Sequence, residues 1–303
     1  MSYTLPESFI QTIRGVHSER AELWLQGFDR LLAYCEDKWS CQIQLPPPYP
    51  LSYNFVAPVR MNTGQEAVLK LAVPSKDALY EIAALQLYQG LGAARLLDAE
   101  PERGILLIEK LHPGKTLKSV PDEEQATLLA IEVMRSIRRP APDPAAFPSV
   151  AQWFQGYDKL RRHFQGGTGP LPEPVVQKAE TLYRQLQQSA APLEFLHGDL
   201  HHENILSSTR EPWLAIDPKG VLGEAEYGVV PFLMNHHPEH DPAPVLDRRV
   251  RLFAQKLGLD RRRMLAWAYC HAVLSAWWCV EDQVGGVENN LRTAELFDAL
   301  LEA

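Results

Sequence analysis

The alternation of apolar and polar positions in the first third of the chain predicts several strands and one amphipathic helix. The run "AVLKLAV" follows the turn signal Asn62-Thr63-Gly64, which predicts a hairpin near residues 53 to 73. After Pro74, "SKDALYEIAALQLYQGLG" begins with a serine cap, carries apolar residues at helical spacing and ends at glycines. In "AARLLDAEPERGILLIEKL" two short apolar strands flank the turn Pro101 to Gly104, whereas "QLPPPYPLSYNFVAPVR" is expected to be irregular.

From Asp122 onward the apolar positions recur at helical spacing. Helices are predicted for "DEEQATLLAIEVMRSIRR", "VAQWFQGYDKLRRHF", "EPVVQKAETLYRQLQQ" and "RRRMLAWAYCHAVLSAWWCVEDQ". Two short apolar runs, "LEFLHGD" and "WLAIDPKG", lie between the third and the fourth helix. The whole pattern predicts an α+β protein with a strand-rich domain over residues 1–110, including an irregular N-terminal extension, and a larger helical domain over residues 111–303.

Composition narrows the class of protein. The chain has 303 residues, of which 46% are hydrophobic, and this length favours about two domains. No apolar run approaches the roughly 20 residues that cross a bilayer, and "MSYTLPESFIQTIRG" lacks the pattern of a signal peptide. We therefore expect a cytoplasmic protein. The four cysteines show no C-x-x-C spacing, which favours reduced thiols over a zinc framework or disulfides.

Charge narrows the class of ligand. The formal net charge of -8 disfavours a nucleic-acid surface, because no basic stripe is present to displace phosphate counterions. An acidic protein suits a cationic ligand. We expect a small-molecule partner and neither a nucleic acid, a membrane nor an obligate protein partner.

The segment "FLHGDLHHENIL" concentrates candidate chemistry and admits two interpretations. A metal site would need His197, His201 and His202 to converge, but adjacent His201 and His202 point apart on a strand or helix. The spacing His197-x-Asp199-x-x-x-x-Asn204 fits the kinase catalytic loop H-R-D-x-x-x-x-N, with Gly198 in place of the arginine. In that loop the aspartate accepts the proton of the attacking hydroxyl and the asparagine holds magnesium.

Three further residues occur in the order that phosphoryl transfer requires. Asp217 ends "WLAID", thirteen residues after Asn204, where a second metal-binding carboxylate is expected. Lys70 ends "EAVLK", which parallels the strand whose lysine contacts the α and β phosphates, and Glu81 on the following helix is its expected ion-pair partner. The turn "RMNTGQE", with Gly64, is predicted to cover the phosphates.

Together, "LHGDLHHENIL" and "WLAIDPKGVLGEAEYG" resemble the aminoglycoside phosphotransferase family, and the D-P-K-G continuation resembles its streptomycin 6-phosphotransferase and hydroxyurea-resistance kinase branch. The resemblance runs from about Asn54 to the last helix and implies a bilobal protein-kinase-like fold. It implies ATP and Mg²⁺ as cofactors, Asp199 as catalytic base supported by His197, Asn204 and Asp217 as magnesium ligands, and Lys70 at the ATP phosphates.

The same resemblance implies an adenine-binding hinge over residues 108 to 111, including Glu109 and Leu111, which acts through its backbone. One position departs from the family pattern. Relatives often carry an aspartate after the tyrosine that follows the metal-binding segment, whereas this chain reads Glu226-Tyr227-Gly228.

Candidate substrate residues follow from the cationic character of aminoglycosides. Guanidinium groups favour bidentate pairing with carboxylates and stack on aromatic faces. The candidates are Glu281, Asp282, Trp277 and Trp278 at the end of the last long helix, with Asp158 and Trp153 on an earlier one. The alternative is that the carboxylates are solvated and the tryptophans belong to the core.

Two other segments have bland interpretations that we favour. "NHHPEHD", with His236, His237 and His240, is typical of a solvated loop more than of a metal site. The triple proline Pro46 to Pro48 indicates a stiff connector more than a ligand for a polyproline reader.

The sequence thus predicts an ATP- and Mg²⁺-dependent kinase that phosphorylates a hydroxyl of an aminoglycoside, streptomycin in the first place. A kinase for hydroxyurea or a metabolite, a catalytically inactive nucleotide-binding module of the same fold, and a histidine-based metallohydrolase are the alternatives.

Overall fold

The computed structural model describes residues 3–238 and 240–303, and the chain divides into two compact units. Unit 1 comprises Met1–Gly114 together with Ser208–Pro212, and unit 2 comprises Lys115–Ser207 together with Trp213–Ala303. The chain therefore passes from one unit to the other at three places, and the short segment Ser208–Pro212 belongs to unit 1 although both of its neighbours belong to unit 2.

Unit 1 is built on a five-stranded antiparallel sheet with the order β1-β2-β3-β5-β4. Its elements are α1 (Glu7–His17), α2 (Glu19–Trp39), β1 (Cys41–Ile43), β2 (Phe55–Met61), β3 (Glu66–Leu71), α3 (Lys76–Tyr88), β4 (Leu96–Glu100), a 3₁₀ turn (Pro101–Arg103) and β5 (Ile105–Glu109). The predicted hairpin, capped helix and strand pair are confirmed, including the cap, where the Ser75 side chain accepts from the Ala78 N–H.

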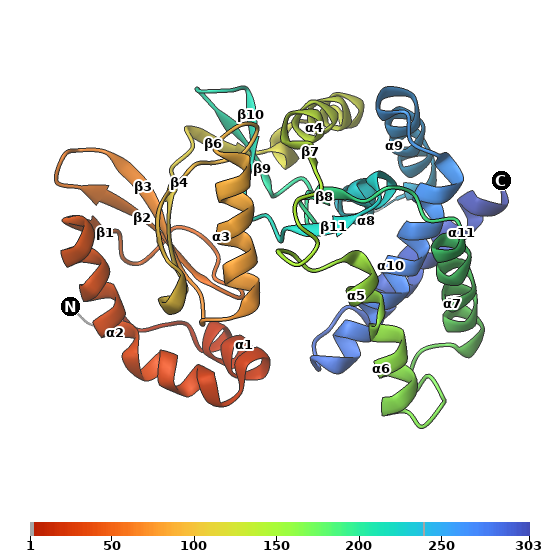
Figure 1. Cartoon of the computed structure of the whole chain (residues 1–303), viewed down its shortest axis with the longest axis horizontal. Coiled ribbons are helices and arrows are strands. Elements are labelled where there is room, and N and C mark those ends of the chain that lie inside the picture. Colours follow the sequence, from red (N-terminus) through yellow and green to blue (C-terminus); the bar gives the residue numbers. More distant parts are fainter. Residues whose placement is uncertain (1–2, 239) are drawn as a thin grey trace. The chain divides into compact units, whose positions relative to one another are not determined.

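The two faces of this sheet have different partners. Because side chains alternate along a strand, Leu69 and Leu71 face the helices α1 and α2, where they join one apolar cluster with Phe9, Trp24 and Phe28. Lys70 points to the opposite face, on the side of α3. Figure 1 shows α1 and α2, in red, on one side of the strands and α3 on the other.

The prediction of an irregular N-terminal extension is wrong. Residues 7–17 and 19–39 form helices, and the strand β2 begins at Phe55 inside the segment that was expected to be irregular. The physical reason is the apolar stripe of α2, where Trp24, Phe28 and Leu32 recur every four residues and are buried against the sheet.

Unit 2 is mainly helical. Its elements are a 3₁₀ turn (Leu117–Ser119), α4 (Glu123–Ile137), β7 (Arg139–Pro140), α5 (Val150–Phe154), α6 (Gly156–His163), α7 (Glu173–Gln188), β8 (Glu194–Leu196), β9 (Ile205–Ser208), β10 (Trp213–Ala215), β11 (Val221–Gly223), a 3₁₀ turn (Ala225–Val229), α8 (Val230–Met234), α9 (Pro242–Leu257), α10 (Arg261–Glu281) and α11 (Val287–Glu302). The strand β6 (Pro113–Thr116) lies at the boundary of the units.

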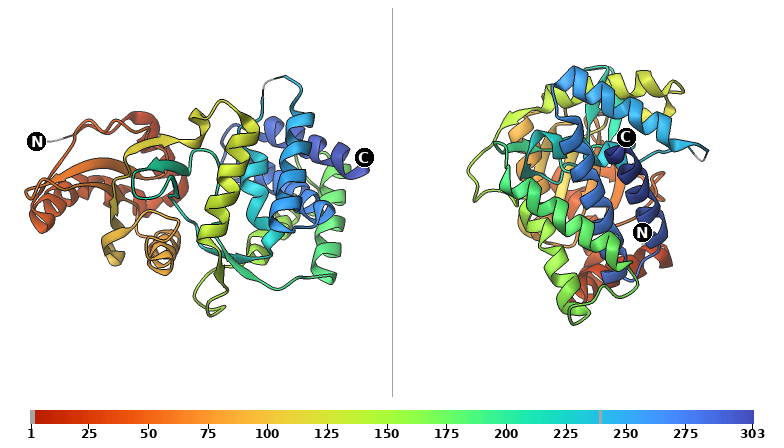
Figure 2. Two further views of the ribbon diagram at one scale, coloured as in Figure 1. Left: turned by 90° about the horizontal axis from the view of Figure 1, so that it is seen from above. Right: turned by 90° about the vertical axis from the view of Figure 1, so that its right-hand side faces the viewer.

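The helix α10 forms the centre of unit 2. Most of its residues are buried, from Met264 to Trp277, and it packs against α7 and α11 on neighbouring sides (Figures 1 and 2). The four predicted helices are present, although the second is divided at Gln155 into α5 and α6. The helices α9 and α11 were not predicted.

Two three-stranded sheets with the orders β10-β9-β6 and β11-β8-β7 position the segment between β8 and β11. In the hairpin of β9 and β10, Ala215 pairs with Ile205 and Trp213 pairs with Ser207. The segment "HGDLHHEN" therefore joins β8 to β9, and Asp217 lies two residues after the end of β10.

Candidate active site

The lysine on β3 is held in a buried ion pair. The Lys70 Nζ atom donates to Glu81 Oε1 of α3 at 2.8 Å, and the two residues are 4% and 8% exposed. Burial of such a pair requires this close contact, because either charge alone would lose its hydration without compensation. The pairing of Lys70 with Glu81 that the sequence predicted is therefore present in unit 1.

Gly64 lies at the wrong end of the hairpin for the predicted role. It follows β2 in the turn to β3, with a φ of 88°, whereas Lys70 lies at the far end of β3. Lys70 lies six positions after Gly64 along extended chain, which corresponds to roughly 20 Å, so this turn is too far from Lys70 for the predicted role. The loop over residues 44–54 ends beside Lys70 instead, because Val56 near the start of β2 pairs with Lys70.

The side chains of the predicted hinge segment, at the end of β5 and just after it, are engaged in contacts within the protein. The Glu109 carboxylate accepts from Arg210, and Leu111 is buried. Lys110 and His112 both contact Glu66 of β3, with Nζ–Oε1 and Nε2–Oε2 distances of 2.8 and 3.2 Å. Any contact of Glu109 or Leu111 with a nucleotide would therefore come from the backbone, as the resemblance implies.

In unit 2, His197 supports the turn that carries Asp199. Its Nε2 atom lies 2.9 Å from the Ile216 carbonyl oxygen, and its Nδ1 atom accepts from the Asp199 N–H at 3.3 Å. An acceptor at Nδ1 and a carbonyl at Nε2 define the neutral tautomer that is protonated at Nε2. Burial lowers the pKa of His197 to about 3, so the ring stays neutral and cannot act as a base near neutral pH.

The Asp199 side chain remains partly open, with 36% of its surface exposed. Burial of the rest raises its pKa above the ordinary aspartate value, and the charge of Asp217 adds to this shift. Lys219, His201 and a hydrogen bond from Asn204 act in the opposite direction. Asp199 is thus a carboxylate whose basicity is raised while it keeps access to solvent.

Asn204 and Asp217 are brought together at the base of the β9–β10 hairpin. The Asn204 carbonyl oxygen accepts from the Ile216 N–H at 2.9 Å, and Asp217 is the next residue. The Asn204 side-chain amide nitrogen donates to the Asp199 carbonyl oxygen at 2.8 Å, so Oδ1 is the atom of this amide that suits a cation. Asp217 has a positive φ of 56°, a conformation that non-glycine residues adopt rarely.

Gly198 stands where kinases have arginine, and the structure explains the difference. Its φ is 84°, and a Cβ atom placed there would lie 2.9 Å from Val221 Cγ1 and 3.2 Å from the Trp153 ring. Only glycine combines this backbone conformation with such close neighbours. The same contacts place the Trp153 ring directly against the catalytic segment.

The two extra histidines support the segment locally. The His201 ring lies 3.7 Å from the Asp199 carboxylate and 3.2 Å from the Asn204 amide nitrogen. His202 is buried against Phe232, with ring centroids 4.0 Å apart, and lies 3.5 Å from the Arg249 guanidinium. Burial lowers the pKa of His202 to about 2. Within residues 3–238 and 240–303, no three His, Cys, Asp or Glu side chains converge as a metal-binding group.

The candidate substrate residues separate into two sets. Trp277 is buried against His163 and Phe164. Its ring is therefore covered by the core and is not available to bind a cation, contrary to the prediction. Trp278 is half-buried, with ring centroids 6.5 Å from Trp153 and 5.6 Å from His271. The structure thus brings Trp278 and not Trp277 next to Trp153 and the catalytic segment.

The acidic candidates are not gathered beside these rings. Glu281 and Asp282 are exposed at the end of α10. Asp158 is also exposed, and its charge acts on Tyr183 of α7. Because Gly156 faces α10 and Asp158 lies two residues further along α6, the Asp158 side chain projects from another side of the helix.

Sequence reasoning missed Glu224. Its buried carboxylate accepts from Arg263, from the Trp267 indole and from the Ala191 N–H. The acidic residue with a structural role in this segment therefore precedes Tyr227 by three residues. The available signal is an acidic residue, Glu224, directly after the apolar run that forms β11.

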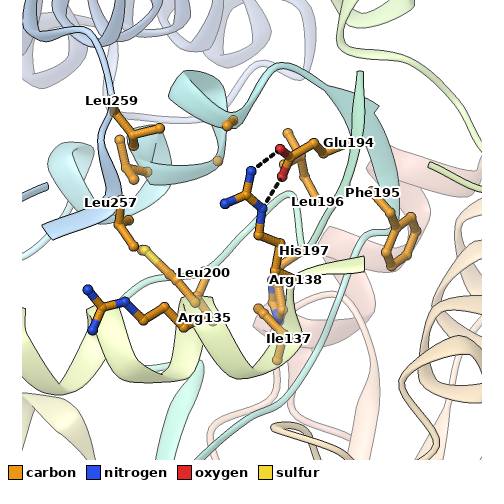
Figure 3. Close-up of a pocket in the computed structure, with 14 residues that line it drawn as sticks. Arg135, Ile137, Arg138, Glu194, Phe195, Leu196, His197, Leu200, Leu257 and Leu259 are labelled. Carbon is orange, nitrogen blue, oxygen red and sulfur yellow. Dashed lines mark hydrogen bonds and ion pairs between the residues drawn. The ribbon is translucent and has the colours of Figure 1, made fainter. Parts of the chain in front are cut away.

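A cavity of about 80 Å³ lies behind the catalytic segment. Figure 3 shows His197 and Leu200 on one wall, Leu257 and Leu259 opposite, and Arg138 paired with Glu194 at the side. The lining is mainly apolar apart from Arg135, Arg138, Glu194 and His197, and it does not include Asp199, Asn204 or Asp217.

Comparisons with known proteins identify relatives that match most of the chain. A profile of the aminoglycoside/hydroxyurea antibiotic resistance kinase family matches residues 39–283. A streptomycin 6-kinase from Streptomyces glaucescens is 29% identical, with 92% of this chain and 91% of that protein covered. A hydroxyurea phosphotransferase from Kitasatospora aureofaciens is 28% identical, with 90% and 79% covered.

A solved structure supports the fold. The ternary complex of aminoglycoside phosphotransferase APH(4)-Ia with ADP and hygromycin B has a TM-score of 0.64 at 13% identity and covers 90% of this chain and 98% of that one. The α+β, protein-kinase-like fold that the sequence predicted is thereby confirmed. No helix in the described ranges, 3–238 and 240–303, is long and apolar enough to cross a membrane. By its sequence, the chain belongs to the aminoglycoside/hydroxyurea antibiotic resistance kinase family.

Proposed function

We propose that this protein transfers the γ-phosphate of ATP to a hydroxyl group of a cationic small molecule, with streptomycin as the first substrate to test. The observation that carries this proposal is the joint placement of Asp199, Asn204 and Asp217 around the base of one hairpin. Relatives named streptomycin 6-kinase match nearly the whole chain and support the choice of acceptor.

The donor set around the hairpin base fits magnesium. Magnesium prefers oxygen ligands, takes one or two protein carboxylates or amides, and retains several waters. The Asn204 amide, anchored through its nitrogen, and the Asp217 carboxylate supply two such oxygens. When bound there, Mg²⁺ would neutralise negative charge on the phosphates.

Asp199 is the proposed catalytic base. A base works best when its pKa lies nearer the operating pH than that of an ordinary carboxylate, and burial moves Asp199 in this direction. The neutral His197 ring fixes the backbone of the same turn through the Asp199 N–H. Asp199 would thus receive the proton of the acceptor hydroxyl while His197 positions it.

Lys70 is the proposed phosphate-contacting residue of unit 1. Glu81 of α3 fixes its ammonium group on the sheet face opposite α1 and α2. The loop over residues 44–54 takes the covering role that the sequence assigned to Gly64, because it ends where Lys70 lies. It carries prolines in place of the glycines of the kinase pattern.

Trp153 and Trp278 are the proposed acceptor-binding aromatics. Both are half-buried, and Trp153 touches the segment that carries Asp199. Faces of tryptophan attract guanidinium and ammonium groups. This proposal replaces Trp277, whose ring is enclosed.

The test is a turnover assay with the purified protein, Mg²⁺, ATP and a panel of streptomycin, kanamycin, hydroxyurea and simple sugars. ADP release and the mass of each product are followed. A phosphate-sized gain in the mass of streptomycin is the expected result. A phosphate-sized gain in the mass of hydroxyurea alone would identify hydroxyurea as the acceptor in place of streptomycin. Binding of ATP without turnover on any acceptor would favour the catalytically inactive module.

A further inference from the structure

The turn of the β9–β10 hairpin is anchored in unit 1. The segment Ser208–Pro212 is part of unit 1, whereas Ile205–Ser207 and Trp213–Ala215, the strand residues on both sides of it, are part of unit 2. The turn is closed by its own backbone, since the Ser208 N–H donates to the Pro212 carbonyl at 3.2 Å. A rigid turn of this kind transmits its position to the strands that it joins.

Arg210 holds this turn. Its guanidinium donates to both oxygens of Glu109, with Nε–Oε1 and Nη2–Oε2 distances of 3.1 and 3.0 Å. The same group donates to the carbonyl oxygens of Gly90 and Ala93 at 2.6 and 2.9 Å. Parallel bonds to one carboxylate combine directional specificity with charge, which a lysine cannot reproduce.

Glu109 is itself fixed at the start of the hinge. Its Oε2 atom accepts from the Arg95 N–H, and its own N–H donates to the Arg95 carbonyl oxygen. Burial alone would raise the pKa of Glu109, but the bonds from Arg210 and Arg95 outweigh it and hold the pKa below the ordinary value. The carboxylate is therefore ionised, and its side chain is only 20% exposed.

The other end of the hairpin carries the proposed metal ligands. Asn204 precedes β9 and Asp217 follows β10, and the Asn204–Ile216 backbone bond closes the base. Only three residues of each strand lie between the anchored turn and this base. A displacement of the turn would therefore act on both oxygen donors at once.

We propose that the Arg210–Glu109 pair positions the β9–β10 hairpin for metal binding. Arg210 then affects the affinity for Mg²⁺-nucleotide without contacting the metal ion or the nucleotide. This inference rests on the proposed function, because it takes Asn204 and Asp217 as the magnesium ligands. Arg210 and Glu109 are positioning residues. Groups that hydrogen-bond a metal ligand directly typically change metal affinity about 10- to 100-fold. Arg210 acts at one further remove, through the hairpin, so we expect an effect at or below the lower end of this range.

The experiment measures nucleotide binding separately from turnover. A non-hydrolysable ATP analogue is titrated by calorimetry into Arg210→Met, with and without Mg²⁺, and the gain in affinity that Mg²⁺ supplies is compared with the wild type. We expect this gain to fall by up to about tenfold. Because Arg210 also contacts Glu109 of the proposed hinge, metal-free binding is measured for each variant, and only the ratio of the two affinities reports on the magnesium ligands. The KM for Mg²⁺-ATP should rise by the same factor, and the KM for the acceptor should not change.

Further variants separate positioning from stability. Arg210→Lys keeps the charge but loses the paired bonds and should behave like Arg210→Met, and adding Glu109→Gln to Arg210→Met should have little further effect. Lys38→Met is the matched control, because the ion-pair partners of Lys38, Asp98 and Glu100, belong to β4 of the same unit and not to the hairpin. It should leave the magnesium gain intact.

Two outcomes would overturn the inference. A lower melting temperature of Arg210→Lys with an unchanged magnesium gain would assign the pair to the stability of unit 1 alone. An equal loss in Lys38→Met would show that any weakened ion pair suffices. Asp217→Asn distinguishes this failure from a failure of the proposed function: if its magnesium gain stays at the wild-type level, the ligand assignment is wrong.

Discussion

In unit 1 the charged group proposed for catalysis is buried and fully paired, whereas in unit 2 the proposed base stays partly exposed among groups of both signs. Lys70 and Glu81 neutralise each other, and their contact is part of how β3 and α3 hold together. Asp199 lies near Asp217, whose charge raises the pKa of Asp199. The backbone of Asp199 is held by the His197 and Asn204 side chains. The contrast indicates that loss of the Lys70 charge should affect folding as well as activity, whereas loss of the Asp199 carboxylate should affect mainly the chemistry.

The largest effect on turnover is expected from Asp199→Asn. Loss of the base should lower kcat by about 10²- to 10⁴-fold, while nucleotide binding is kept. Because folding raises the pKa of Asp199, the ionised carboxylate is less favourable in the folded chain than in the unfolded chain, and stability is gained as pH falls through the folded pKa. At neutral pH the variant should therefore melt at or above the wild-type temperature. Near-wild-type turnover would remove Asp199 as the base.

Lys70→Met is expected to have the largest effect on stability. It leaves the Glu81 carboxylate buried without its cation, which typically costs about 3–5 kcal/mol. Adding Glu81→Leu removes this charge, so the double variant should recover most of the loss in denaturant unfolding while remaining inactive. If the single variant unfolds like the wild type, the pair contributes nothing to the fold and the contrast between the units fails.

Gly198→Arg restores the arginine of the kinase pattern and is expected to impair the protein. The positive φ costs roughly 1–2 kcal/mol for any L side chain, and the contacts with Val221 and Trp153 add to this cost. Gly258→Ala is a suitable control, because Gly258 also has a positive φ but a Cβ atom there would meet none of the described residues within 4 Å. Equal losses of stability and turnover in the two variants would reduce the role of Gly198 to backbone conformation.

The pH dependence of kcat/KM should identify the base. Its acid limb is expected above the ordinary aspartate pKa of about 3.9, because burial raises the pKa of Asp199. Lys219→Met removes a charge that lowers this pKa and should move the limb to higher pH. His197, with a pKa of about 3, should add no inflection near neutrality. A limb that stays in place in Lys219→Met would point to another base.

The smallest effects are expected at the acceptor side. Trp278→Leu and Trp153→Phe should raise the KM for a cationic acceptor a few-fold, as expected for a loss of about 0.5–1 kcal/mol of cation–π attraction. A neutral acceptor should be unaffected. Glu281→Gln, at an exposed helix end, is the control and should change neither KM nor stability. A larger effect of Glu281→Gln than of Trp278→Leu would indicate that carboxylates, and not the tryptophan rings, bind the acceptor.

Local signals accounted for much of the fold. The hairpin around Gly64 and the Ser75-capped helix are patterns of neighbouring residues, and the structure reproduces them. The spacing from His197 to Asn204 is also a local pattern, and the roles that it predicts for Asp199 and Asn204 stay predictions. The helices α1 and α2 were missed although the stripe of Trp24, Phe28 and Leu32 has helical spacing. The helix α9 has a similar stripe, Leu246, Val250 and Phe253, but the prolines near its start are also typical of a loop, so the local pattern is ambiguous.

Other features depend on tertiary packing and were outside the reach of a single sequence. The helix α10 is apolar on nearly all sides, so periodicity could not tell that Trp277 faces the core and Trp278 the catalytic segment. The error at Gly64 came from strand order, because which turn lies beside Lys70 depends on the direction of β3. The partner of Arg210 lies 101 residues away, and no local pattern identifies it.

The helices α1 and α2 have a practical consequence. The segment matched by the family profile begins at residue 39, where α2 ends. A protein shortened to that segment would lose the cover over Phe55, Leu69 and Leu71, which lie in one cluster with Phe9, Trp24 and Phe28. An apolar sheet face newly exposed to water promotes self-association. Boundaries chosen from the family profile alone would therefore yield an aggregating product, even though every proposed active-site residue would be retained.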